Sequence, residues 1–232
     1  MRVMHISEPG VAEAAVEAIR RDAILVQLPT VFVLLAPATR EGVGWLDRSK
    51  RRLPNKTYGT AIGDLDRFAA MVVPETRPPE LETTGGLTML TGAFIRCRVA
   101  PVDYDSALVR RGTHQGVLLD GPHRALFAAI EAGLADMSDP DILAGHTSTA
   151  PLCTSCNISG HPLGSITEWE RAQRFASERA VPLVVRGEPA VGHTGSYPIF
   201  ALERDRVAIQ REGPRLEEIK AALPARLFAR AA

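Results

Sequence analysis

The sequence is poor in the features that mark several protein classes. Its three cysteines among 232 residues are too few for a disulfide framework, which excludes a small cross-linked scaffold. Lysine plus arginine number 27, as do aspartate plus glutamate, so overall charge indicates neither nucleic-acid nor membrane binding. The longest apolar run, residues 24–37, is interrupted by polar residues and is too short to span a membrane. Because the N-terminus lacks a signal-peptide pattern, we expect a cytoplasmic protein without membrane contact.

Several catalytic motifs are also missing. The chain has no Walker-type phosphate loop, no Gly-x-Gly-x-x-Gly and no Gly-x-Ser-x-Gly nucleophile elbow. Cys153 and Cys156 have the spacing of half a zinc site, but such a site needs two further ligands, and Cys97 is the only other cysteine. We therefore expect buried or half-buried thiols at both positions, and we predict no metal site.

What remains is the composition of an ordinary folded domain, with 45% hydrophobic and 23% charged residues. We expect one α/β domain over residues 1–232, with a core from about 11 to 213. Hydrophobic periodicity predicts helices over residues 11–21, 65–73, 124–134 and 167–176, and a basic amphipathic helix over about 215–230. It predicts strands over residues 23–28, 31–35, 93–99, 116–119, 181–185, 198–202 and 206–211. Residues 37–44 are predicted to form a turn.

One polar stretch stands out between apolar segments. Residues 151–160 include Thr154, Ser155, Asn157 and Ser159 and end on a glycine. Hydroxyl and amide groups at this density are costly to bury without hydrogen-bond partners. The stretch is therefore predicted to be a loop that hydrogen-bonds its own backbone or holds a polar ligand.

A second stretch, residues 47–56, carries five basic side chains in ten positions. A solvated surface is the usual interpretation of such a run. Pro54 and Asn55 indicate that its end is not helical. In an extended chain, Lys50 and Arg52 would point to the same side, because side chains alternate with a period of two. Two cations on one side would form a clamp for an anion.

The order of these motifs resembles that of the YrdC-like family, the threonylcarbamoyl-AMP synthases. The resemblance covers nearly the whole chain, and the Lys-x-Arg pair and the serine–asparagine loop are its most specific parts. The matching segments are Pro29-Thr30, Lys50-Arg-Arg52, Gly85-Gly-Leu-Thr88, Thr154-Ser-Cys-Asn157-Ile-Ser-Gly160, Gly195-Ser196 and Arg211-Glu-Gly213. The resemblance implies a twisted mixed α/β sheet with flanking helices around a positively charged concave cavity.

The resemblance also implies an activity and roles for residues. A family enzyme combines L-threonine, bicarbonate and ATP into threonylcarbamoyl-AMP and pyrophosphate, usually with Mg²⁺, for tRNA modification. Transfer RNA or tRNA-modification proteins would then be partners. By position, Lys50 and Arg52 would neutralise the phosphates and the carbamate, and Thr30 would touch the threonine moiety. The residues that would bind the nucleotide are Thr154, Ser155, Asn157, Ser196, Arg211 and Lys56.

Two departures from the family pattern leave other functions open. Asp120 stands where the family has the arginine of Arg-x-Pro, and a carboxylate there would oppose triphosphate binding. Tyr197 stands where the family has a threonine, and its ring would narrow or restack the pocket. The alternatives are a non-catalytic module that binds a nucleotide or RNA, and carbamoyl-adenylate chemistry on another amino acid in a specialised biosynthetic pathway.

Overall fold

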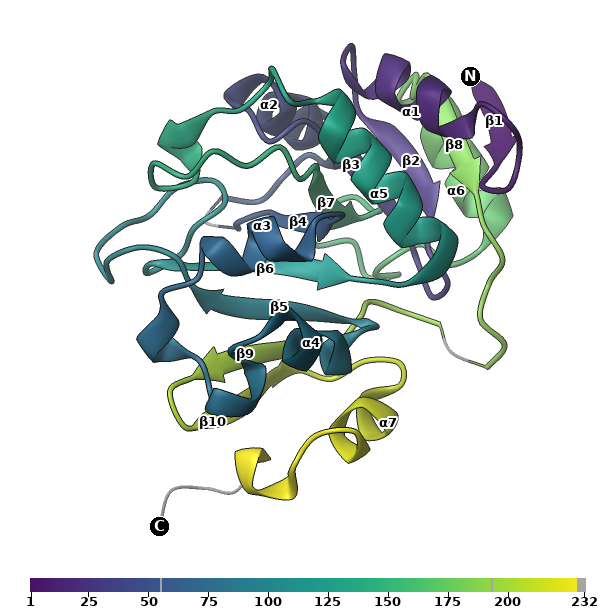
Figure 1. Cartoon of the computed structure of the whole chain (residues 1–232). Coiled ribbons are helices and arrows are strands. Elements are labelled where there is room, and N and C mark those ends of the chain that lie inside the picture. The colour runs from purple at the N-terminus through teal and green to yellow at the C-terminus, as the bar shows by residue number, and fades with distance from the viewer. Residues whose placement is uncertain (55, 193, 229–232) are drawn as a thin grey trace.

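The computed structural model describes residues 1–54, 56–192 and 194–228. The strands in this part of the chain form one sheet in the order β1-β8-β2-β3-β7-β4-β6-β5-β9-β10 (Figure 1). The strands are β1 (Arg2–His5), β2 (Ile24–Gln27), β3 (Phe32–Ala36), β4 (Gly59–Ile62), β5 (Ala93–Arg98), β6 (Thr113–Leu118), β7 (Leu152–Ser155), β8 (Leu183–Arg186), β9 (Ile199–Glu203) and β10 (Arg206–Arg211). The α-helices are α1 (Val11–Ile19), α2 (Arg40–Lys50), α3 (Leu65–Ala70), α4 (Thr84–Leu87), α5 (Gly121–Gly133), α6 (Trp169–Glu178) and α7 (Leu216–Ala221).

Late strands are inserted among early ones. Strand β8 lies between β1 and β2 and is parallel to both, whereas β7 lies between β3 and β4 and is antiparallel to both. Strand β9 joins the other side of the sheet, parallel to β5, and forms a hairpin with β10. The predicted mixed α/β sheet with flanking helices is therefore confirmed. The insertions place strands that are far apart in the sequence side by side, such as β8 next to β1 and β2 (Figure 1).

Helices cover both faces of the sheet. Ile19 of α1 and Phe127 of α5 are fully buried in one hydrophobic cluster, and Leu46 of α2 and Phe68 of α3 are buried in the other. The side chains of β3 alternate between these two clusters, as the two-residue period of a strand requires. Burial on both faces explains why β2 and β3 read as continuous apolar runs in the sequence.

Helix α2 replaces the turn predicted over residues 37–44, so that prediction is wrong from Arg40 onward. Thr39 caps the helix, because its side-chain oxygen accepts a hydrogen bond from the Gly42 amide at 3.1 Å. The two glycines of the segment are poor helix formers and hid the helix in the sequence. Gly42 is nevertheless required there, because a Cβ at this position would lie 2.1 Å from the Pro37 carbonyl oxygen.

The course of the chain beyond α2 also differs from the prediction. Lys50 is the last residue of the helix, so the extended conformation expected for Lys50 and Arg52 is wrong. The chain reverses instead at Arg51, whose left-handed backbone has φ 47° and ψ 58°. Asn55, which the sequence places at the non-helical end of this segment, lies outside the described residues.

The polar stretch of residues 151–160 is only partly a loop. Its first half forms β7 in the interior of the sheet, and Thr154 is buried there. The loop begins after the strand, where the Cys156 amide still donates a hydrogen bond to the Phe32 carbonyl oxygen at 2.7 Å. The prediction of a loop is therefore wrong for residues 152–155.

The C-terminal helix is shorter than predicted. Helix α7 ends at Ala221, and a 3₁₀ turn follows over Ala225–Phe228. Pro224 stands between the two, where its ring and missing N–H interrupt a helix. Residues 229 and 230 of the predicted helix lie outside the described residues. No helix in the described part of the chain is long and apolar enough to cross a membrane.

The glycine pair of the Gly85-Gly-Leu-Thr88 segment lies in α4 and packs against the 3₁₀ turn Pro79–Leu81. A Cβ at Gly86 would lie 2.0 Å from the Glu80 carbonyl oxygen, whereas a Cβ at Gly85 would have nothing nearer than the Thr83 hydroxyl at 3.7 Å. The packing therefore leaves no room for a side chain at Gly86, whereas it leaves room for one at Gly85.

We predict opposite effects of alanine at the two positions. Gly86→Ala should lower the free energy of unfolding by about 1 to 3 kcal/mol, because the added methyl group meets backbone. Gly85→Ala should leave it unchanged or raise it by up to about 1 kcal/mol, because alanine is the better helix former. Urea denaturation of both variants measures the difference, and equal stabilities would contradict this packing.

Candidate functional site

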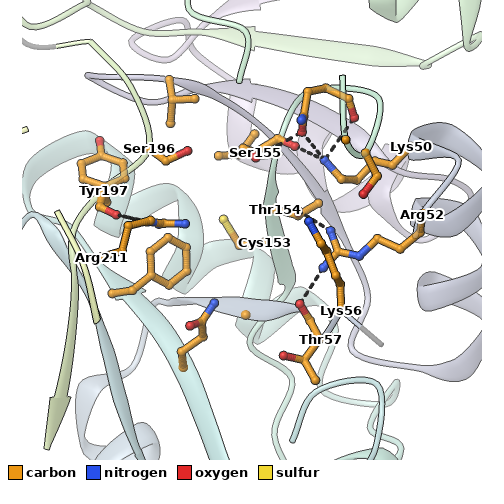
Figure 2. A pocket seen from close by; sticks show the side chains of 18 residues that line it. Lys50, Arg52, Lys56, Thr57, Cys153, Thr154, Ser155, Ser196, Tyr197 and Arg211 are labelled. Carbon is orange, nitrogen blue, oxygen red and sulfur yellow. Dashed lines mark hydrogen bonds between the residues drawn. The ribbon is translucent and has the colours of Figure 1, made fainter. Parts of the chain in front are cut away.

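A cavity of about 220 Å³ lies on the sheet face that α1 and α5 cover elsewhere (Figure 2). It is lined by the end of α2, the segment leading into β4, the strands β3, β5, β6, β7 and the end of β10. The lining residues are Val31, Val33, Lys50, Arg52, Lys56, Thr57, Gly59, Phe94, Gln115, Cys153, Thr154, Ser155, Asn157, Ser159, Gly160, Ser196, Tyr197 and Arg211. Every site residue predicted from the sequence is among them except Thr30.

The charged side chains in the described lining of this cavity are all basic. Its lining, as far as the chain is described, contains the cations Lys50, Arg52, Lys56 and Arg211 and no aspartate, glutamate or histidine. Cations held close together without a carboxylate attract an anionic ligand. Asp120, expected to oppose phosphate binding, is an exposed residue before α5 and does not line the cavity, so that expectation is wrong.

Lys50 is buried, with 1% of its surface exposed. Its Nζ donates hydrogen bonds to the Ser155 carbonyl oxygen, to the Asn157 carbonyl oxygen at 3.2 Å and to Asn157 Oδ1 at 2.7 Å. These three acceptors match the three donors of an ammonium group. Lys50 therefore fastens the end of α2 to the turn that follows β7. Burial, and then the charge of Arg52, lowers the pKa of Lys50 to about 7.

Arg52 and Lys56 form the cationic end of the cavity (Figure 2). Arg52 donates to the Thr57 carbonyl oxygen at 2.6 Å and to Thr154 Oγ1 at 3.3 Å. Its guanidinium stacks 4.1 Å above the ring of Tyr58. Its Nε is buried and has no hydrogen-bond partner among the described residues. Burial lowers the pKa of Arg52, opposed by the charges of Tyr58 and Asp47. This end of the cavity therefore holds positive charge in partly desolvated surroundings.

Arg211 and Tyr197 form the opposite end, with Cys153 and Thr154 between the two ends (Figure 2). Arg211 donates from Nε and Nη2 to the Tyr197 carbonyl oxygen, at 3.0 and 2.6 Å. Tyr197 is buried at this end of the cavity. Ser196 shares a hydrogen bond of 2.8 Å with the hydroxyl of Ser165. Ser196 therefore joins two loops at the edge of the cavity.

Thr30 lies behind this end and does not line the cavity. It is buried, and its hydroxyl donates to the Gly195 carbonyl oxygen at 2.8 Å, while the Gly195 amide donates to the Thr30 carbonyl oxygen at 2.8 Å. The structure therefore does not bring Thr30 into the cavity with the other predicted residues. Thr30 holds in place the segment that carries Ser196 and Tyr197.

Sequence reasoning missed several lining residues, among them Phe94 and Gln115. Gln115 had one detectable signal, because Thr113 and Gln115 alternate with buried residues along β6. The predicted strand begins only at residue 116, so this polar face was lost. Phe94 belongs to no motif and reads as an ordinary strand residue.

The two cysteines of the Cys-x-x-Cys spacing are buried free thiols, as predicted. Cys153 belongs to the hydrophobic cluster of α1 and α5, and Cys156 belongs to the cluster on the other face of the sheet. Burial raises the pKa of both thiols to about 12. Both therefore stay protonated near neutral pH, and only Cys153 faces the cavity.

The buried Lys50 predicts a pH dependence of stability. Between pH about 7 and 10.5 the unfolded chain holds a proton on this residue that the folded chain has lost. Raising the pH through this window should therefore stabilise the folded state of the ligand-free protein, by up to about 1.4 kcal/mol per pH unit. Lys50→Met should lack this rise. Denaturation curves of both proteins between pH 7 and 9 measure the difference.

The buried thiols oppose this effect only above about pH 9, outside the range of these curves. Lys56→Met is the control, because Lys56 lines the same cavity with an exposed side chain, and it should keep the rise. Parallel curves for wild type and Lys50→Met would contradict the lowered pKa of Lys50.

Comparison with known proteins gives a likeness of structure. No family model matches the sequence, and no curated protein matches it. The chain is similar to E. coli YciO, with a TM-score of 0.62 at 14% identity over 91% of this chain and 94% of that one. It is similar to P. abyssi Sua5 complexed with L-threonine, with a TM-score of 0.66 at 17% identity over 96% of this chain and 61% of that one.

A third likeness is to full-length HypF in the phosphate- and nucleotide-bound form, with a TM-score of 0.59 at 13% identity over 88% of this chain and 29% of that one. The chain thus spans nearly all of YciO but under two thirds of Sua5 and less than a third of HypF. At these identities the likeness is one of fold. The chain has the fold of YrdC-like proteins, as the order of its motifs predicts.

Proposed function

We propose that this protein is a nucleotidyltransferase that forms threonylcarbamoyl-AMP and pyrophosphate from L-threonine, bicarbonate and ATP. One observation carries the proposal: the Lys50-x-Arg52 pair and the Ser155-x-Asn157 segment line one cavity whose described lining holds no carboxylate, and Lys50 hydrogen-bonds both Ser155 and Asn157. The likeness to a Sua5 structure that contains L-threonine supports the choice of amino acid. Proteins that modify tRNA would use the product.

The reaction needs charge neutralisation more than proton transfer. The amino group of threonine and bicarbonate form a carbamate, and water leaves. A carbamate oxygen then attacks the α-phosphorus of ATP, an oxygen–phosphorus bond forms, and the bond to the β-phosphate oxygen breaks to release pyrophosphate. Arg52 and Lys56 at one end of the cavity and Arg211 at the other would neutralise the negative charge of the reacting groups. Ser155 and Thr154 would orient the phosphates by hydrogen bonds.

Mg²⁺ would enter with the nucleotide. The described lining offers no carboxylate, and no group of three or more His, Cys, Asp or Glu side chains in the described part of the chain is arranged to hold a metal ion. These residues do not fit a Mg²⁺ site made by the protein. Mg²⁺ commonly binds through the phosphate oxygens of a nucleotide, which would hold it here.

A second candidate is the same chemistry on another amino acid. Tyr197 is 3% exposed, and its backbone is fixed by the two hydrogen bonds from Arg211. A tyrosine ring at this end of the cavity would reduce the room for a substrate side chain. A panel of amino acids in place of threonine distinguishes the two candidates by which one releases pyrophosphate fastest.

We predict that the purified protein releases pyrophosphate when ATP, Mg²⁺, bicarbonate and L-threonine are all present. Arg52→Gln should lower kcat/KM by about 10²-fold or more, because one donor to the transition-state charge is lost. The measurement is a coupled pyrophosphate assay with thermal unfolding recorded in parallel.

Arg51→Gln is the matched control, since Arg51 is the neighbouring arginine, is exposed and does not line the cavity. This variant should keep the wild-type rate. Absence of pyrophosphate with threonine and with every other amino acid, together with tight ATP binding, would overturn the enzyme and select a non-catalytic binding module.

A further inference from the structure

A glutamine in the cavity wall is held by an arginine behind it. Gln115 of β6 and Arg96 of β5 are cross-strand partners. Gln115 lines the cavity, whereas Arg96 lines a separate hollow of about 390 Å³ on the outer part of the sheet. Arg96 Nη2 donates to Gln115 Oε1 at 2.5 Å, and Arg96 Nη1 donates to Gln210 Oε1 at 2.6 Å. One guanidinium therefore holds two glutamines, of which only Gln115 reaches the cavity.

This contact fixes the orientation of the Gln115 amide. A guanidinium carries only donors, so the side of the amide that faces it must be the oxygen. The amide nitrogen then lies on the opposite side, away from Arg96 and toward the cavity. Arginine keeps its charge in proteins, so this orientation does not change with pH.

The result is a wall of the cavity that offers N–H donors. Arg211, which lines the same cavity, uses Nε and Nη2 on the Tyr197 carbonyl oxygen, which leaves Nη1 as a donor for a ligand. The Gln115 amide adds an uncharged N–H donor to the charged donor of Arg211. A group that binds between them needs oxygen acceptors, and a phosphate or carboxylate provides them whereas an ammonium group does not.

We propose that Gln115 determines ligand specificity by donating a hydrogen bond to an anionic oxygen of the nucleotide, and that Arg96 is the residue that positions it. The inference rests on the proposed function only in taking ATP as the ligand. It adds a residue outside every motif of the sequence. It also gives Arg96 a role in binding although Arg96 does not line the cavity.

The test compares two glutamines that share the same arginine. Calorimetry with ATP and Mg²⁺ gives Kd for wild type, Gln115→Met and Gln210→Met. Both variants lose one hydrogen bond to Arg96, but only Gln115→Met removes a donor from the cavity. Gln115→Met should bind about tenfold more weakly, the effect of one lost hydrogen bond. Gln210→Met should stay within about twofold of wild type.

Three further variants examine the direction of the amide. Gln115→Glu should weaken ATP binding more than Gln115→Met, because its carboxylate pairs with Arg96 and turns an acceptor toward the phosphates. Arg96→Met should weaken binding because the amide is free to rotate. The double variant Arg96→Met with Gln115→Met should bind no more weakly than Gln115→Met alone, since Arg96 acts through Gln115.

The outcomes separate this inference from the proposed function. Equal affinities for wild type and Gln115→Met, equal losses in Gln115→Met and Gln210→Met, or additive effects of the two positions would each overturn it. Failure of the wild-type protein to bind ATP would also overturn it. ATP binding without pyrophosphate release would overturn the enzyme and leave the comparison of the two glutamines valid.

Discussion

The hydrogen bonds made by the buried Nζ of Lys50 are the interaction on which the site depends. They join the end of α2 to the turn after β7, two segments about a hundred positions apart in the chain, through acceptors on Ser155 and Asn157. A charge buried in this way is costly unless every donor is satisfied. The same bonds place Arg52 beside Thr154, because the chain reverses directly after the lysine. The cationic end of the cavity is thus positioned by Lys50, whose own donors bind protein acceptors and are not available to a ligand.

The order of motifs was sufficient to predict the fold and the cations of the described cavity lining, but some local reasons were wrong. Lys50 and Arg52 share a cavity because a helix ends between them in a left-handed residue, and this backbone conformation is not encoded in side-chain alternation. Strand β7 was predicted to be a loop because hydroxyl groups are costly to bury without hydrogen-bond partners. The Thr154 hydroxyl has such a partner in Arg52, which lies far away in the sequence. The orientation of the Gln115 amide depends on its cross-strand partner Arg96, so no sequence motif could predict it.

The cavity also separates side chains whose polar groups remain available from side chains whose polar groups already bind protein partners. Thr30 holds the segment with Ser196, and Ser196 in turn is bonded to Ser165. Several polar side chains expected to touch a ligand therefore have protein partners already. The side chains left to select a ligand are mainly guanidinium and ammonium groups and one oriented amide. Such a set recognises charge and oxygen geometry more than the shape of an apolar group.

The insertion of β7 and β8 among earlier strands has a consequence for folding. While the ribosome has made only the first half of the chain, β3 and β4 lack the strand that separates them, and each exposes an unpaired edge. These edges pair only after β7 has been synthesised, and the free edge of β2 pairs later still, when β8 follows. Contacts between such distant segments slow folding and leave apolar strands open to association with other chains. A nascent chain of this protein should therefore depend on a chaperone until its last third has been synthesised.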